Sequence, residues 1–167
     1  AGLLVIPPVW PVNKSQVANP QQTLQQLTLN LHSLGRHADW VVIDLGQEVP
    51  EDWLPLYKAA SDWCLVTSAD EDAVTETYAL IKWLTHQTRH ANLHVLLNRI
   101  TRSAHADAHS ALATLENSCR EFLQRSLGIT GIMLDDPALA TISHRGRKAH
   151  HEGLSSETAH ELLTWAQ

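Results

Sequence analysis

Short apolar runs alternate with helical patterns along this chain, and that alternation limits the folds it can adopt. Each run is nearly continuous in apolar residues, which is typical of strands covered on both faces. Strands that alternate with helices favour a parallel sheet with right-handed crossovers. We therefore expect an α/β fold, a doubly wound, mostly parallel sheet with helices on both faces, formed by residues 1–167 as a single domain. The predicted strands are Leu3–Ile6, Trp40–Asp44, Trp63–Thr67, Leu93–Leu97 and Ile129–Leu134.

The helices are predicted from apolar residues spaced three and four positions apart, which form one face of a helix. The clearest pattern covers Ser103–Leu127. A second long helix is expected after Asp70, a suitable N-cap residue, with Val74 and Ile81 on its apolar face. The remaining predicted helices run from Asn19 to Gly35, from Glu51 to Ala60, from Pro137 to Ile142 and from Ser155 to Trp165.

Charge and cysteine content narrow the function classes. The net charge of −6 argues against direct nucleic-acid binding, because such proteins need a basic face. Only Cys64 and Cys119 are present, both in apolar patterns, so we expect reduced thiols in a cytoplasmic protein. The C-terminal helix is acidic and has no basic face, which does not support membrane association. Because the sequence contains no phosphate-binding loop, we expect no cofactor to be tightly bound by this chain.

Polar side chains follow the predicted strands, at the edge where open parallel sheets bind ligands. Asp44 and Gly46 follow one strand: an acid there can hold a magnesium-bound water, and a glycine lets the backbone approach a phosphate. Asn98 follows another strand, and an amide can hydrogen-bond a purine edge through its donor and its acceptor. The alternative is that these are simply the polar residues with which buried strands end.

Two other groups of residues are candidates for binding. His105 and His109 have the i, i+4 spacing of a metal pair, but their polar surroundings favour exposed surface histidines over a metal site. A local basic patch is either a solvated loop or a contact for an anionic group or a protein partner. Its cationic members are Arg145, Arg147 and Lys148. The phosphate-binding motif GxxxxGK[ST] does not occur in these 167 residues, so we expect this chain by itself neither to bind a triphosphate tightly nor to hydrolyse it.

The order of these segments resembles the MinD/ParA group of deviant P-loop ATPases, most closely its flagellar-number regulator branch. The segment DWCLVTSADEDAVTETYALIKWL is similar to the family's strand ending in Thr-Pro-Glu and the helix that follows it. WVVIDLG resembles the Walker B/switch II strand, and LHVLLNRIT resembles the strand that delivers an asparagine to adenine. The opening GLLVIPP resembles a strand ending in an Ile-Pro-Gly turn, and GIMLDDPALATISHRGR resembles the family's strand ending in Asp-Pro with the helix and basic loop that follow it.

This resemblance implies roles for individual residues. Asp44, with Gly46 beside it, would be catalytic, organising Mg and the attacking water, and ATP with Mg would be the cofactors of a complete parent protein. A homodimer or a regulatory protein partner is implied as well. The match begins after the family's P-loop, so we expect an N-terminally incomplete P-loop NTPase-like domain, about the C-terminal two-thirds of the ATPase. The nucleotide-binding residues would be Asn98, Arg99, Asp135, Asp136 and Pro137.

The sequence departs from the family at two places that bear on activity. Gln47 and Glu48 stand where the family keeps small residues, and Ala69 stands where it has the glutamate of Thr-Pro-Glu. These departures favour one alternative, a non-catalytic pseudo-ATPase that acts as a protein–protein interaction module. A second alternative is a flavodoxin-like regulatory domain in which Asp44 is only a strand-end acid.

Overall fold

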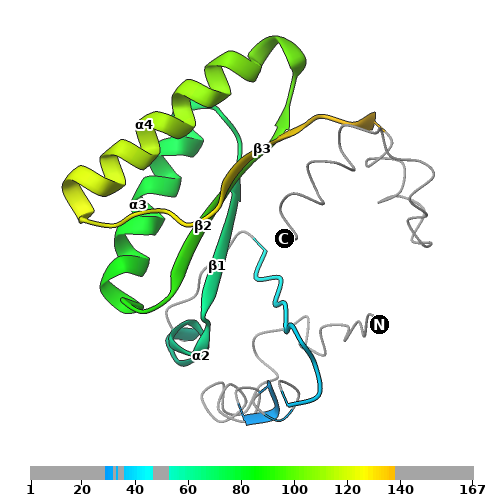
Figure 1. Ribbon diagram of the computed structural model, residues 1–167, viewed down its shortest axis with the longest axis vertical. Helices are drawn as coiled ribbons and strands as arrows, with labels where there is room; N and C mark the ends of the chain where they lie inside the picture. The colour runs from blue at the N-terminus through cyan, green and yellow to red at the C-terminus, as the bar shows by residue number, and fades with distance from the viewer. Residues whose placement is uncertain (1–28, 32, 34–35, 47–52, 138–167) are drawn as a thin grey trace, which may run out of the picture. The chain divides into compact units, whose positions relative to one another are not determined.

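The computed structural model describes residues 29–31, 33, 36–46 and 53–137 (Figure 1). The chain divides into two compact units, Ala1–Ala59 and Ala60–Gln167. The described helical parts of the first unit are residues 29–31 and 33 and the helix α2 (Leu54–Ala59). The second unit contains all the described strands. The prediction that residues 1–167 form one domain stays a prediction.

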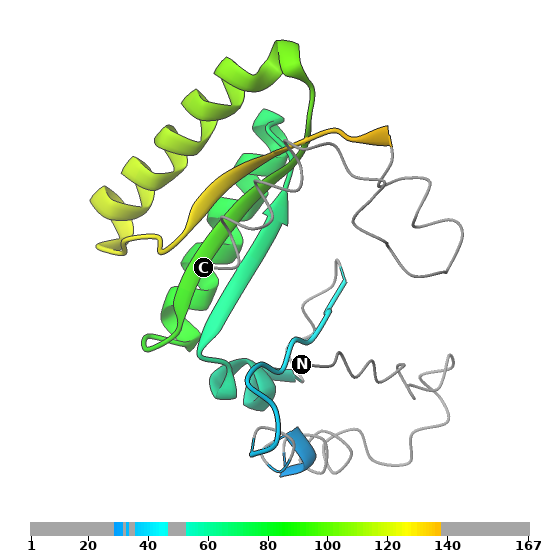
Figure 2. The same cartoon turned by 45° about the vertical axis from the view of Figure 1, so that its right-hand side comes forward.

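The second unit is built on a parallel sheet of three strands, which confirms the predicted α/β class. The strands are β1 (Asp62–Thr67), β2 (Asn92–Ile100) and β3 (Thr130–Leu134), and they lie in the order β1-β2-β3. Figure 2 shows them side by side with β2 in the centre. The register of β1 on β2 runs without interruption from the pair Asp62 and Asn92 to the pair Thr67 and Leu97.

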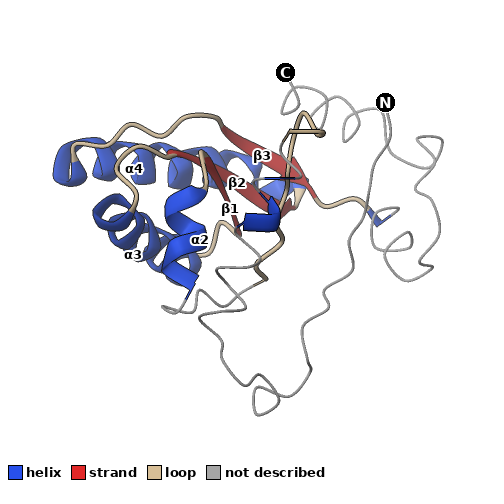
Figure 3. Cartoon of the chain, turned by 90° about the horizontal axis from the view of Figure 1, so that it is seen from below, coloured by secondary structure: helices blue, strands red, loops and turns tan. Residues whose placement is uncertain are grey.

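Two long helices connect these strands and lie on the same face of the sheet (Figures 1 and 3). They are α3 (Glu71–Gln87), between β1 and β2, and α4 (His105–Leu123), which follows a short 3-10 helix, η3 (Arg102–Ala104). Both crossovers move in the same direction across the sheet, and right-handed crossovers of that kind place their helices on one face. Within residues 60–137, the second face carries no helix.

The hydrophobic core lies between this sheet and the two helices. Along β2, Leu93, Val95 and Leu97 are almost completely buried, and α3 contributes Ile81 while α4 contributes Leu115. β1 and β2 thus alternate between a buried and a more exposed side, as in a sheet with one covered face. On β1, for example, Val66 is 58% exposed. Within residues 60–137 the two long helices cover one face of the sheet, and the expectation of helices on both faces stays a prediction.

Residues 36–46 also depart from the prediction. Trp40–Asp44 was expected to be a strand, but these residues form no strand and are exposed, Trp40 by 78% and Val42 by 87%. An apolar run becomes a strand only where a neighbouring strand supplies its hydrogen bonds. The predicted strand Leu3–Ile6 and the predicted helix Ser155–Trp165 lie outside the described residues.

Candidate functional site

The carboxyl edge of the sheet brings together several of the predicted nucleotide-binding residues. Asn98 and Arg99 lie near the end of β2, and Asp135 directly follows β3. The two strand ends are joined by the backbone, because the N–H of Asp135 donates to the carbonyl oxygen of Ile100 at 2.9 Å. Asp136 and Pro137 continue from Asp135, and the backbone is helical at Pro137. Residues far apart in the sequence therefore meet at one edge.

A β-bulge shapes this edge. Leu97 pairs with Ile132 and Ile100 pairs with Leu134, so β2 has one residue more than β3 between these two pairs. The additional residue falls at Asn98–Arg99, and Arg99 has a positive φ of 59° although it is not a glycine. This left-handed conformation costs a side-chain-bearing residue about 1 kcal/mol or more, and such strain is concentrated at functional sites. Bulges also re-aim the side chains of a strand.

The side chains at the bulge are only partly engaged. Oδ1 of Asn98 accepts a hydrogen bond from the N–H of Arg99 at 2.9 Å, while its Nδ2 group donates to no acceptor among the described residues. Nε of Arg99 lies 3.9 Å from Oδ1 of Asp135, and these side chains are 83% and 50% exposed. An exposed ion pair of this kind contributes little to stability. A ligand could therefore displace the pair at small cost.

The loop after β1 completes this edge but has a different charge. Thr67 donates through Oγ1 to the carbonyl oxygen of Ala73 at 3.4 Å, and Oγ of Ser68 donates to Oδ2 of Asp70 at 2.6 Å. Asp70 is the N-cap residue of α3, as predicted, but makes no side-chain capping hydrogen bond. Glu71 and Asp72 occupy the first turn, where they suit the positive end of the helix dipole. Three consecutive carboxylates make this loop unfavourable for a phosphate.

Asp44 and Gly46 lie in the first unit and form a turn. Oδ1 of Asp44 accepts a hydrogen bond from the N–H of Gly46 at 2.9 Å, and Gly46 has a φ of 67°, which glycine adopts without strain. The carboxylate of Asp44 is exposed, so its second oxygen can approach a cation. Arg145, Arg147 and Lys148 lie outside the described residues.

The histidine pair does not form a metal cluster with other ligands. The rings of His105 and His109 pack edge to face, with centroids 4.6 Å apart and an interplanar angle of 81°. Among the residues that the structure describes, no group of three or more His, Cys, Asp or Glu side chains could hold a metal ion. None of the helices in that same part of the chain has the length and hydropathy needed to cross a bilayer.

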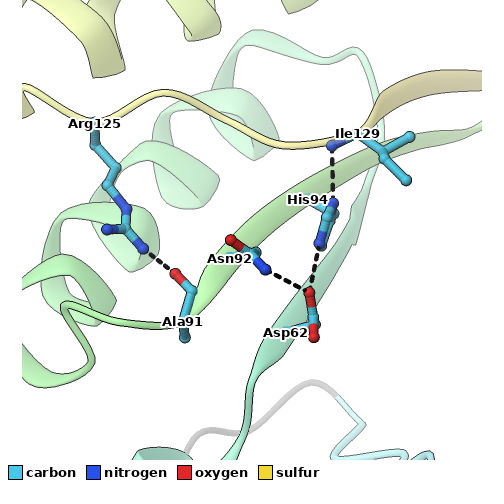
Figure 4. A network of polar contacts seen from close by, with 6 residues as sticks. All are labelled: Asp62, Ala91, Asn92, His94, Arg125 and Ile129. Atoms are coloured by element: carbon cyan, nitrogen blue, oxygen red, sulfur yellow. Dashed lines mark hydrogen bonds and ion pairs between the residues drawn. The ribbon is translucent and has the colours of Figure 1, made fainter. Parts of the chain in front are cut away.

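A polar network at the opposite, amino-terminal edge of the sheet was missed from the sequence (Figure 4). Asp62 begins β1 and Asn92 begins β2, and Nδ2 of Asn92 donates to Oδ1 of Asp62 at 2.9 Å. Nε2 of His94 lies 3.1 Å from the same oxygen. Hydrogen bonds from Ser61, Asn92 and His94 lower the pKa of Asp62 to about 2. The sequence did contain one signal for this network: a polar residue, Asp62 or Asn92, directly precedes each of two strands that were expected to lie in one sheet.

An open hollow of about 390 Å³ lies at this same edge, lined by His90–Leu93 and Gln124–Gly128. Arg125 holds the two sides of the hollow together: its guanidinium donates through Nη1 to the carbonyl oxygen of Arg89 at 2.7 Å and through Nη2 to that of Ala91. Gln124 ends α4 in the left-handed conformation, with a φ of 51°. The chain turn after α4 is thus tied to the turn before β2.

Comparison of the sequence with protein-family models and with curated proteins finds no match.

Proposed function

We propose that this chain is part of a MinD/ParA-like ATP-binding regulatory protein that controls the placement or number of a cell-surface machine such as the flagellum. In this proposal its fold is the doubly wound, P-loop NTPase-like one, and it acts as a homodimer or with a regulatory protein partner. The observation that carries the proposal is the strained bulge at Asn98–Arg99, hydrogen-bonded through Ile100 to Asp135.

The chemistry of this edge suits an adenine base. The Nδ2 group of Asn98 can donate to a ring nitrogen, and the half-exposed carboxylate of Asp135 can accept from the exocyclic amino group. Guanine has a carbonyl oxygen where adenine has that amino group. This oxygen would face the carboxylate of Asp135, and two hydrogen-bond acceptors cannot pair. The edge therefore favours ATP over GTP. Arg99, Asp136 and Pro137 would border the base.

The remaining roles in the proposal fall to the first unit. Asp44 would keep the role that the resemblance implies, a carboxylate that holds a Mg²⁺-bound water, with Gly46 beside it. Tight binding would also need a phosphate-binding loop, which is absent from these 167 residues. We therefore expect no ATP turnover, and weak or no ATP binding, from the 167-residue chain alone.

Calorimetry on the protein expressed from its complete reading frame tests base recognition. Mg-ATP should bind more tightly than Mg-GTP, and Asn98→Ala should weaken ATP binding about tenfold, the effect of one lost hydrogen bond. Asn92→Ala is the matched control, because the same residue type lies at the other end of β2. Equal affinities for the two nucleotides, or an Asn98→Ala variant that binds ATP like the wild type, would contradict the proposal.

Hydrolysis by the same protein tests the role of Asp44. Asp44→Asn should abolish ATP turnover with little change in stability, because the carboxylate is exposed and its hydrogen bond within the described residues goes to the nearby N–H of Gly46. Asp39→Asn, a second exposed aspartate in the same unit, should leave turnover unchanged. Unchanged turnover in Asp44→Asn would remove Asp44 from the mechanism.

The charge of the loop after β1 favours a second candidate function. Asp70, Glu71 and Asp72 would repel a phosphate at the edge where a nucleotide would lie. A non-catalytic pseudo-ATPase that serves as an interaction module is compatible with those charges. If the complete protein binds neither nucleotide in calorimetry, this second candidate replaces the first.

A further inference from the structure

His94 of β2 is held between two hydrogen-bonding groups, one at each ring nitrogen. The N–H of Ile129 donates to Nδ1 at 2.8 Å, so Nδ1 carries a lone pair. A neutral imidazole then carries its proton on Nε2, which lies 3.1 Å from Oδ1 of Asp62 and donates to it. Both ring nitrogens are engaged, one as acceptor and one as donor (Figure 4). In the neutral ring, this geometry is compatible with one tautomer, the one that carries its proton on Nε2.

The surroundings leave this ring little room to move. Its side chain is only 16% exposed. A Cβ atom added to Gly128 would lie 2.7 Å from Cε1 and 2.8 Å from Nδ1 of His94, so the ring is in close contact with the backbone there. Glycine at this position is what permits the contact.

The Ile129 amide lies at the junction between α4 and β3. On either side of it, the N–H of Gly128 donates to the carbonyl oxygen of Leu93 at 2.8 Å, and the N–H of Val95 donates to that of Ile129 at 3.1 Å. Residues 124–128 of this junction line the hollow at the amino-terminal edge. The hydrogen bond from Ile129 to His94 therefore links the junction that lines the hollow to β2. The side chain that makes this link can change its charge.

We propose that His94 is a pH-sensitive latch, whose neutral ring holds the junction between α4 and β3 and whose protonation releases the Ile129 amide. Once Nδ1 is protonated it is a donor, and it then faces the N–H of Ile129, a second donor, at hydrogen-bonding distance. Rotation of the ring does not relieve this, because both nitrogens of the cation are donors. Imidazole is the side chain whose charge ordinarily changes between about pH 5 and 8.

The neighbouring charged groups determine which contact is lost. Hydrogen bonds from Ser61, Asn92 and His94 lower the pKa of Asp62 to about 2, so this carboxylate stays charged and retains the protonated ring. Cys64, the partner of His94 in the β1 register, has its thiol pKa raised by burial and stays neutral. Glu116 of α4 accepts from Oγ1 of Thr130 at 2.6 Å, and Thr130 pairs with Val95 on the helix-covered face. Protonation thus breaks the Ile129 contact and leaves the Asp62 contact intact.

Amide hydrogen exchange measured by NMR on the full chain tests the latch. After correction for intrinsic exchange, the protection factor of the Ile129 amide should fall about tenfold as the pH is lowered from about 8 to 5. His94→Asn is the decisive variant, because the Asn oxygen can replace Nδ1 as acceptor but does not titrate. Its Ile129 protection should stay constant over this range. A constant value in the wild type, or an unchanged pH dependence in His94→Asn, would overturn the proposal.

Two further variants separate this latch from its surroundings. His90→Asn removes another imidazole that lines the hollow and should leave the pH dependence of Ile129 intact. His94→Gln can reach Asp62 but lacks an acceptor near Nδ1, so its Ile129 amide should be poorly protected at every pH. If His94→Asn does not fold, His94→Gln decides the question: protection equal to that of the wild type at pH 8 would refute the latch.

Discussion

Nε of Arg99 lies 3.9 Å from Oδ1 of Asp135, across the ends of two neighbouring parallel strands. Both side chains are exposed, and the firm connection between these strand ends is the backbone bond from Asp135 to Ile100. Exposed ion pairs contribute about 0–1 kcal/mol, so the two charges are brought together by the bulge rather than by their mutual attraction. The backbone thus determines the shape of this edge of the sheet, and the exposed side chains of Arg99 and Asp135 can still contact a ligand.

Arg99→Gly should stabilise the protein by about 1 kcal/mol, because glycine adopts a φ of 59° without strain. Urea denaturation of the wild type and the variant measures this gain. Arg99→Ala is the control, since alanine loses the same charge and keeps the unfavourable backbone. If both variants have the same stability, the bulge stores no strain at Arg99.

Gly128→Ala should destabilise the fold by about 1–3 kcal/mol, the usual cost of overpacking. The new Cβ would lie 2.7 Å from Cε1 of His94, and two hydrogen bonds prevent this ring from moving aside. In a protein that already carries His94→Ala, the change Gly128→Ala should destabilise the fold much less than it does in the wild type. A double-mutant cycle of thermal unfolding measures this difference. Additive effects would mean that the ring and the glycine do not touch.

Arg125→Lys should destabilise the protein by about 1–3 kcal/mol, because a lysine cannot reproduce a guanidinium that donates to two carbonyl oxygens at once. Arg120→Lys makes a conservative change on the exposed side of α4 and should have little effect. Urea denaturation of the two variants provides the comparison. Equal stabilities would show that the bonds to Arg89 and Ala91 do not hold these turns together.

The fold should become less stable in acid, because protonation of Asp62 removes the stabilising contribution of its carboxylate. Its pKa is about 2 in the folded protein against an ordinary value of 3.8, so its contribution is present above pH 3.8 and is lost as the pH falls towards about 2. Asp62→Asn should flatten the pH dependence of unfolding in this window, and Asn92→Ala should flatten it partly. Because the side chain is 37% exposed, solvent screening reduces the size of the effect. An identical pH profile for Asp62→Asn would contradict this assignment.

The elements of residues 60–137 could be predicted from the sequence because each has a local signal. A continuous apolar run marks β1, and α3 begins directly after the predicted cap residue Asp70. The spacing of apolar residues predicted Ser103–Leu127, and α4 covers His105–Leu123. Local patterns were enough to predict these elements because the strands and helices of residues 60–137 also pack against one another in the fold.

The features that the sequence did not predict depend on partners distant in the chain. Asp62 and His94 are 32 residues apart, and their contact follows only from the register of β1 on β2. The bulge requires a left-handed arginine, which no local preference predicts. Trp40–Asp44 shows the converse, since this apolar run forms no strand and pairs with none of the strands that the structure describes. The predicted meeting of Asn98 and Asp135 at one edge followed from a general property of parallel sheets.

The bulge in β2 also determines where this strand tolerates a change in length. Leu97 and Ile100 are both buried although three positions separate them, because the additional residue resets the alternation of faces. Deletion of Arg99 would give a regular ladder with the same side chains in the core. Deletion of a residue earlier in β2, such as Leu96, would turn the following side chains to the wrong face. Evolution could therefore remodel the rim of this sheet by losing a single codon while the interior stays as it is.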